Sequence, residues 1–186
     1  MLALFYERTK DNPPSQLLVQ ALDHCVRRTD ALDLGCGAGR DTRWLLQQGF
    51  WVTAVDQNPD AFLYFQNVQR DQLTLVQSPI ETFPFETYDL VNAQWSLPFI
   101  QNDLFEETFT KIKQALRPDS IFTGQFFGIH DTWNTPGTTM TFCTSEQAQQ
   151  FLHDLSIITF WEEDEDGETA LGVLKHWHVF HFIARK

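Results

Sequence analysis

The chain has 186 residues, a formal net charge of −12 at pH 7 and a sequence pI near 4.7. Nucleic-acid-binding proteins neutralise phosphates with clustered lysines and arginines, and this sequence has no such cluster, so nucleic-acid partners are disfavoured. No stretch approaches the roughly 20 uninterrupted apolar residues of a membrane span, and no signal-peptide pattern opens the chain. Three irregularly spaced cysteines do not make a disulfide framework. These features predict a reduced cytoplasmic protein without a membrane partner.

The opening of the chain predicts an N-terminal segment followed by a helix. Residues 1–12 mix Phe5 and Tyr6 with charged residues and precede two prolines. Ser15 is a good helix cap, and apolar residues at helical spacing continue to about Val26. In the simplest interpretation, the two aromatic side chains anchor this segment on the core.

The most informative stretch is a strand that runs into a glycine-rich turn and then a helix, over residues 31–46. Open α/β folds build nucleotide pockets in this way. A dinucleotide would place its anionic pyrophosphate at the helix N-terminus, where the Asp33 carboxylate would repel it. Arg40 also stands where the third glycine of a dinucleotide loop belongs. The aspartate instead favours S-adenosylmethionine (SAM), which carries an ammonium and a sulfonium, and disfavours an NAD-dependent oxidoreductase.

A second acidic residue follows at the expected distance. A strand-like run over residues 50–55 ends at Asp56, which lies 21 residues after Gly35. In this architecture an acid roughly 20 residues further on holds the ribose hydroxyls, which predicts that role for Asp56. The alternative is that Asp56 caps the next helix, although Asn58 stands in the better position for a cap.

The rest of the sequence alternates predicted strands and helices. The acidic run over residues 162–166 predicts a solvated loop that ends at Gly167. The whole pattern indicates a three-layer, Rossmann-like α/β fold with a mostly parallel sheet and an antiparallel last strand. The remaining predicted elements are strands over residues 73–77, 88–93, 121–127, 156–161 and 177–184, and helices over residues 104–116 and 146–153, the latter capped by Ser145.

Ligands of open α/β sheets bind beyond the carboxyl ends of the strands, so residues that follow two later strands are acceptor-side candidates. They are Gln94 and Trp95 after the fourth strand, and His130, Asp131 and Trp133 after the fifth. We predict a catalytic or acceptor-site role for the histidine and aspartate of this second group, and pocket roles for the other three residues. The alternatives are turn chemistry for the aspartate and plain core packing for both tryptophans.

Histidines near the end of the chain are further candidates for the substrate pocket. His176 and His178 alternate, so a strand would place both on one face, with His181 opposite. A near-neutral pKa suits an acceptor-site role, and the alternative is a structural or merely exposed position. A metal site needs a third ligand, which the sequence does not make evident, so we expect no metal.

Residues 31–56 resemble motifs I and II of the class I SAM-dependent methyltransferases, and the order of the later elements follows that family. The nearest resemblance is to small, single-domain TehB-like (tellurite-resistance-type) methyltransferases. It implies that the N-terminal segment lies over the cofactor, with Tyr6 or Arg8 as lid residues, and Tyr6 is also a candidate for the substrate pocket. Pro79 stands where the family often carries the acid that contacts adenine, which leaves its neighbours as substitutes. The cofactor-binding residues that the resemblance implies are Asp33, Gly35, Cys36, Gly37, Gly39, Asp56, Gln57, Ser78, Ile80 and Asn92.

The predicted function is therefore methyl transfer from SAM to a small-molecule acceptor, with S-adenosylhomocysteine (SAH) as product. The alternative is a non-catalytic module or sensor that binds SAM or SAH. We expect one domain over residues 1–186, made of an N-terminal segment (1–28), a cofactor-binding core (29–128) and an acceptor-side portion (129–186). The oligomeric state is not readable from the sequence.

Overall fold

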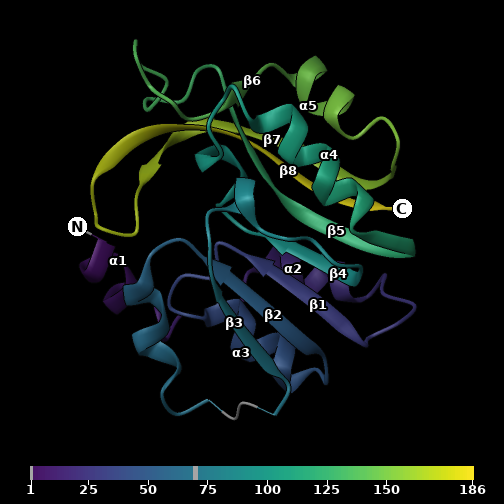
Figure 1. The fold of residues 1–186 in the computed structure, drawn as a ribbon. Helices are drawn as coiled ribbons and strands as arrows, with labels where there is room; N and C mark the ends of the chain where they lie inside the picture. Colours follow the sequence, from purple (N-terminus) through teal and green to yellow (C-terminus); the bar gives the residue numbers. More distant parts are fainter. Residues whose placement is uncertain (1, 69–70) are drawn as a thin grey trace.

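The computed structural model describes residues 2–68 and 71–186. Its strands are β1 (Asp30–Leu34), β2 (Trp51–Asp56), β3 (Leu73–Gln77), β4 (Tyr88–Ala93), β5 (Leu116–Gly128), β6 (Phe142–Cys143), β7 (Ser156–Glu168) and β8 (Leu174–Arg185). They form one sheet in the order β3-β2-β1-β4-β5-β8-β7, with the short β6 paired to β5 (Figure 1). The strands β1 to β5 are parallel, whereas β8 runs antiparallel to both β5 and β7. The predicted mostly parallel sheet with an antiparallel end is confirmed.

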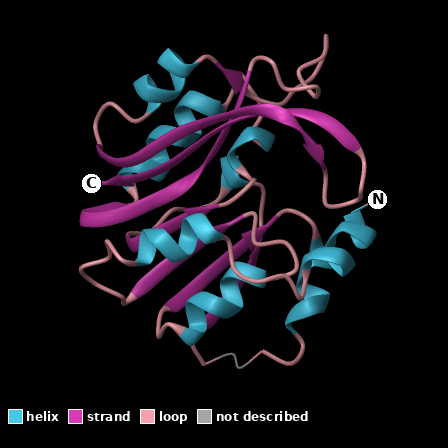
Figure 2. Ribbon diagram, turned by 180° about the vertical axis from the view of Figure 1, so that it is seen from behind, coloured by secondary structure: helices cyan, strands magenta, loops and turns pink. Residues whose placement is uncertain are grey.

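Helices cover both faces of the sheet (Figure 2). Because successive strand residues point to opposite faces, Ala31 and Leu90 pack against α2 and α3, while Leu32 and Val91 belong to the core under α4 and α5. This gives the predicted three layers. The helices are α1 (Leu2–Thr9), α2 (Gln16–Leu22), α3 (Arg40–Gln47), α4 (Phe105–Gln114) and α5 (Ser145–Phe151), with 3-10 turns η1 (Pro59–Phe65), η2 (Ile80–Thr82) and η3 (Leu97–Phe99).

None of the helices in the described residues has the length and apolar character needed to cross a membrane. The longest, α4, has ten residues and buries one side, where Phe105, Phe109 and Ile112 face the sheet. Its exposed side carries an ion pair between Glu107 and Lys111. This amphipathic pattern is that of a helix on the surface of a globular core.

The β7–β8 hairpin extends beyond the neighbouring strands and arches toward the start of the chain (Figure 1). At its tip, Gly172 lies beside the guanidinium of Arg8 on α1. The hairpin and α1 therefore approach each other from the two ends of the sequence, at the edge where the parallel strands terminate.

Three local predictions are wrong. The acidic run over residues 162–166 is part of β7 rather than a loop, because it pairs with β8, where His178 and His176 lie across from Asp164 and Asp166. The helix after Ser15 ends at Leu22, four residues early. The cap of α5 is Thr144 instead of Ser145, because the Thr144 hydroxyl accepts the Gln147 N–H while the Gln147 side chain accepts the Thr144 N–H, a capping box.

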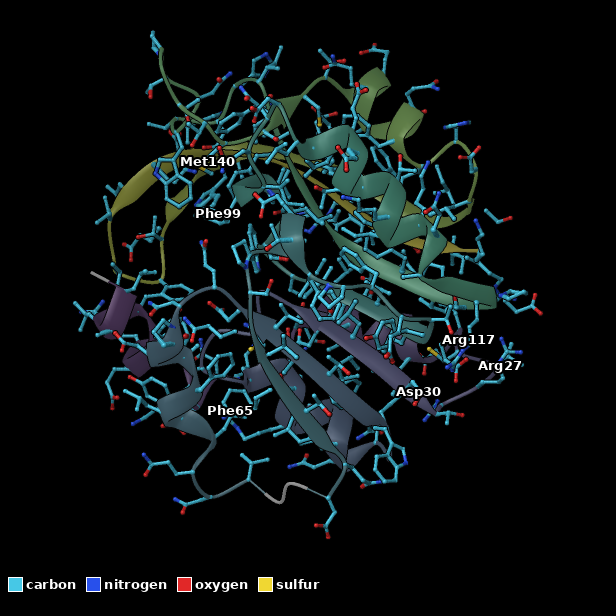
Figure 3. All side chains as sticks on the ribbon, in the orientation of Figure 1. Arg27, Asp30, Phe65, Phe99, Arg117 and Met140 are labelled. Atoms are coloured by element: carbon cyan, nitrogen blue, oxygen red, sulfur yellow. The ribbon has the colours of Figure 1, made fainter. Side chains whose placement is uncertain are left out.

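The two ends of the parallel strands differ in chemistry. Figure 3 shows Arg27, Asp30 and Arg117 gathered at the amino ends, far from Phe99 and Met140. The Arg117 guanidinium lies 2.6 Å from the Asp30 carboxylate, and Arg27 pairs with the buried Asp89 at 3.1 Å. These ion pairs connect the segments at the amino ends of the strands. Ligands of such sheets bind at the opposite, carboxyl ends.

Candidate active site

The glycine loop joins β1 to α3 at the carboxyl edge of the sheet. Gly35, Gly37 and Gly39 have φ values of 70°, 52° and 80°, in the left-handed region that favours glycine. A Cβ on Gly35 would lie 2.5 Å from the Cβ of Ser96, so the loop and the turn after β4 approach each other too closely for a side chain. Only glycine therefore fits at this point of the loop.

Asp33 lies almost fully buried beneath this loop, 2% exposed. Its carboxylate accepts hydrogen bonds from the Thr42 hydroxyl at 2.5 Å and from the Asn92 amide at 2.8 Å, both of which are neutral groups. Burial, reinforced by the nearby Asp41, raises the pKa of Asp33 to about 7. A buried carboxylate with neutral partners gains from a nearby cation.

Two further polar atoms near Asp33 are unsatisfied. In the part of the chain that the structure describes, Asn92 Oδ1 and Ser96 Oγ are buried without a hydrogen-bond partner. Buried acceptors normally have a donor, so such atoms call for an explanation. The ammonium of a methionyl group would supply donors to Asn92 Oδ1 and a positive charge to Asp33. The residues present therefore fit the charged end of SAM.

Asp56 connects β2 to the glycine loop. One of its oxygens accepts the Gly37 N–H at 2.9 Å, and the other accepts the Asn58 N–H at 2.9 Å. The side chain is half-buried, and each carboxylate oxygen has a further lone pair for a ligand hydroxyl. Asn58, rather than Asp56, caps η1 by accepting the Asp60 N–H at 3.1 Å, as the sequence predicted.

Tyr6 lies over the same loop from α1. Its ring is buried, packs near Gly37 and Ala38, and makes an edge contact with Tyr64. Burial, and then the Asp56 carboxylate, raise the pKa of its hydroxyl, which therefore stays protonated. Tyr6 therefore anchors the N-terminal segment beside the glycine loop, whereas Phe5, the other predicted anchor, is exposed. That Tyr6 lies over a cofactor stays a prediction.

The other predicted cofactor residues differ in how far they are exposed. Cys36 is buried inside the loop, and burial raises the pKa of its thiol, which keeps it neutral. Gln57 is exposed, and Ser78 is half-buried with its hydroxyl donating to the Pro79 carbonyl at 2.8 Å. Ile80 packs against the main core from η2. Their contacts with a ligand remain predictions.

Gln94 belongs to a buried network behind the loop. Its Oε1 accepts the Ser15 hydroxyl at 2.8 Å and the Gln125 amide at 2.7 Å. Gln125 in turn accepts the backbone N–H of Trp95 at 2.8 Å. Trp95 has a φ of 58°, in the left-handed region. The network fixes the turn after β4 and so sets the direction of the Trp95 ring.

That ring belongs to an aromatic cluster at the carboxyl ends of β4 and β5 and the beginning of β8. Trp95 contacts Phe127 and Trp177, and Trp133 contacts the same two rings. Trp95 and Trp133 are each more than a third exposed, so the cluster is open to solvent. We define the aromatic cluster as Trp95, Phe99, Phe127, Trp133 and Trp177.

A buried ion pair lies within the aromatic cluster. Lys175 Nζ lies 2.5 Å from Asp131 Oδ1, and is 3.7 Å and 3.8 Å from the ring centroids of Trp133 and Trp177. Burial lowers the pKa of Lys175, while Asp131 opposes that shift. Lys175 and Trp177 were not predicted as site residues, although their alternate spacing in a strand places them on one face.

The structure separates His130 from Asp131. Asp131 points to Lys175 on the face of Trp177, whereas His130 stacks on His178, which lies on the opposite face of β8 because strand residues alternate. His176 shares the face of His178, and His181 contacts Trp95 on the other, as the alternation predicted. His130, His176 and His178 thus lie together, apart from the aromatic cluster, and their acceptor-site role stays a prediction.

Comparisons with known proteins agree with this geometry. Residues 32–123 match the model of a methyltransferase domain family. An uncharacterized methyltransferase of Synechocystis is 32% identical over 93 residues, which are 49% of this chain and 43% of that protein. The match therefore spans less than half the length of that relative.

Solved structures share the fold. TehB from Haemophilus influenzae has a TM-score of 0.80 at 16% identity, over 98% of this chain and 65% of that one. The N-methyltransferase NodS from Bradyrhizobium japonicum, in complex with SAH, has a TM-score of 0.68 at 17% identity, over 100% and 98%. The matched residues include the glycine loop between β1 and α3, so this part of the chain is similar to a methyltransferase domain, and the solved structures share its fold.

Proposed function

We propose that this protein transfers a methyl group from SAM to a small-molecule acceptor. The observation that carries the proposal is Asp33, a buried carboxylate with two neutral partners and an unsatisfied amide oxygen beside it. A cationic ligand compensates both groups, whereas a pyrophosphate would be repelled. The match of residues 32–123 to a methyltransferase domain family supports the same donor.

The residues around the glycine loop would each bind a different part of the methyl donor. Asp33 and Asn92 would hold the ammonium, the backbone of Gly35 to Gly39 would lie along the methionyl chain, and Asp56 would accept the ribose hydroxyls. Ser78 and Ile80 would border the adenine, with Gln57 at the rim. Tyr6 would close the site from α1, where its ring already covers Gly37.

When bound, SAM supplies a methyl group on a sulfonium, which leaves as a neutral thioether when the acceptor attacks in line. The protein then mainly has to align the acceptor and exclude water. The buried network of Ser15, Gln94 and Gln125 holds the Trp95 turn in place for this purpose. A general base is required only when the acceptor atom is protonated at the working pH.

The aromatic cluster supports an apolar or π-rich acceptor. Trp95 and Trp133 present exposed ring area at the carboxyl edge of the sheet, where an acceptor would meet the methyl group. Aromatic rings bind planar apolar groups by offset or edge contacts. The net charge of −12 disfavours nucleic-acid substrates. We also propose that residues 1–186 form a single domain and that the protein is cytoplasmic.

Isothermal titration with SAH tests the proposal. We expect micromolar or tighter binding to the wild type, a loss of binding in Asp56→Ala, and no change in Asp103→Ala, which alters an exposed aspartate far along the chain. No binding to the wild type would overturn the methyltransferase proposal. Binding without methyl transfer to any acceptor in a panel, and without slow donor hydrolysis, would instead indicate a binding module.

A further inference from the structure

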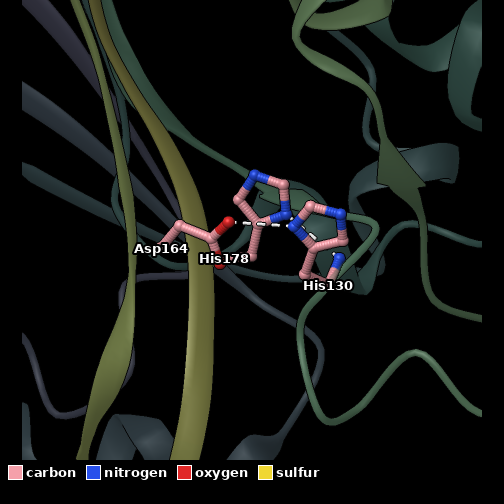
Figure 4. Close-up of side chains that lie close together, drawn as sticks. All are labelled: His130, Asp164 and His178. Atoms are coloured by element: carbon pink, nitrogen blue, oxygen red, sulfur yellow. Dashed lines mark hydrogen bonds and ion pairs between the residues drawn. The ribbon is translucent and has the colours of Figure 1, made fainter.

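A second cluster of ligand-type side chains lies on the opposite face of β8 from the aromatic cluster. His130 follows β5, Asp164 lies on β7 and His178 lies on β8, and one ligand atom from each falls within 4.8 Å of the other two (Figure 4). The sequence pattern offered two alternating histidines without a third ligand. The fold brings a carboxylate and another histidine to them from two separate segments.

The cluster is held by specific contacts. His130 Nδ1 lies 2.9 Å from Asp164 Oδ2, while His176 Nε2 lies 2.7 Å from the other oxygen of Asp164. The His178 ring is buried and stacks on His130 at 4.6 Å between ring centroids. It occupies the space beside Gly128 where any Cβ would lie about 2.2 Å from it. The buried imidazole is therefore fixed, and the exposed one can adjust.

A further carboxylate orients one ligand of the cluster. Glu162 lies 2.8 Å from His178 Nε2. Metal-binding histidines commonly present one nitrogen to the ion and donate the other N–H to such a carboxylate. His178 Nδ1 now accepts the peptide N–H of His130 at 3.0 Å, so an ion would replace that hydrogen bond with a metal–nitrogen bond.

We propose that His130, Asp164 and His178 form a site for a divalent transition-metal ion of the zinc type. Two imidazoles and one carboxylate suit zinc or cobalt better than magnesium or calcium, which prefer all-oxygen sites. The exposed side chains of His130 and Asp164 give the ion a path from solvent and leave room for water as a fourth ligand. This proposal does not rest on the proposed methyl transfer.

Such an ion would tie the loop after β5 to the β7–β8 hairpin. The residue next to His130 is Asp131, whose carboxylate holds Lys175 within the aromatic cluster on the other face. Fixing His130 therefore also restrains the segment that positions Trp133 and Lys175. The ion would act on the acceptor side through backbone position and would not touch the methyl donor.

The test is a titration of untagged, chelator-treated protein with Co²⁺, followed by visible absorption, and with Zn²⁺, followed by calorimetry. We expect one equivalent to bind with micromolar affinity. His130→Ala and Asp164→Asn should each weaken binding by at least about tenfold, because each removes a ligand. His153→Ala is the matched control, since it alters an exposed histidine 2.6 Å from Asp154 outside the cluster.

Millimolar or weaker binding to the wild type would overturn the proposal, and so would binding that both cluster variants retain. A loss shared equally by His153→Ala would point to non-specific association and would also overturn it. Thermal unfolding of each variant without metal checks that the substitutions leave the fold intact. SAH binding, measured in parallel, is expected to stay unchanged, which separates this result from the proposed methyl transfer.

Discussion

Two buried carboxylates at the carboxyl edge of the sheet are satisfied in different ways. Asp33, at the glycine loop, has only neutral hydrogen-bond partners and a raised pKa of about 7. Asp131, at the aromatic cluster, pairs with the Lys175 ammonium. We propose that a ligand supplies the positive charge beside Asp33, whereas the chain itself supplies the one beside Asp131. On this proposal, the cationic methyl donor would bind at the glycine loop, and the acceptor would meet the aromatic cluster.

Removing the internal cation gives the largest expected effect. Lys175→Met keeps most of the packing against Trp133 and Trp177 but leaves Asp131 buried without its partner. The free energy of unfolding should fall by about 3–5 kcal/mol, as is typical when one partner of a buried ion pair is lost. Urea unfolding measures the change, and Lys113→Met, which breaks an ion pair with the exposed Asp154, should cost about 0–1 kcal/mol.

The double variant Lys175→Met with Asp131→Asn sharpens the comparison. Because no buried charge is left unpaired, most of the lost stability should return. If the double variant is as unstable as Lys175→Met, the lost ion pair does not explain the effect. The stability of the aromatic cluster would then depend on packing of the lysine side-chain methylenes.

Asp33→Asn tests the other carboxylate. Loss of a charged partner should weaken SAH binding by about ten- to hundredfold, corresponding to about 1.5–3 kcal/mol for a hydrogen bond to a charged group. The free energy of unfolding without ligand should be unchanged or higher, because the amide avoids burying a charge among neutral partners. Equal affinity in the variant and the wild type, measured by calorimetry, would show that Asp33 does not contact the ligand.

The pH dependence follows from the same carboxyl group. The folded-state pKa of about 7 lies above the ordinary value for aspartate, about 3.9. Between these values the native state binds more protons than the unfolded state, so the contribution of Asp33 to stability falls as the pH rises. The ammonium of SAH should bind the ionised form of Asp33, so SAH affinity should rise about tenfold from pH 6 to pH 8. Asp33→Asn should remove this dependence.

Ser15→Ala gives the smallest expected effect. It removes the hydroxyl that donates to Gln94 Oε1 and leaves the bond from Gln125 in place. The free energy of unfolding should fall by about 0.5–1.5 kcal/mol. SAH affinity should not change, because the network lies behind the loop; a large loss of affinity would instead place Ser15 in the donor site.

The donor side could be predicted because its parts lie close together in the sequence. The strand, the three glycines and Asp33 form one short motif, and Asp56 follows at a fixed distance. Backbone geometry dominates there, and glycine reports it directly. The predicted layers and mostly parallel sheet were confirmed for the same reason, since each element carries its own hydrophobic period.

The acceptor side is assembled from distant segments, which local patterns do not report. Asp131 meets Lys175 across 44 positions, and His130 meets Asp164 across 34. Adjacent residues such as His130 and Asp131 face opposite ways, so neighbours in the sequence are not neighbours in the site. The acidic run was assigned to a loop because its cross-strand partners on β8 could not be known from composition.

That run has a consequence for the molecule in a crowded solution. β7 is the outermost strand, and exposed carboxylates occupy each position from Glu162 to Asp166. An unpaired strand edge is a template on which another chain can add, but a second copy would place like charges directly opposite each other. The carboxylates on β7 therefore oppose edge-to-edge pairing of two sheets. They should reduce aggregation through this long edge strand.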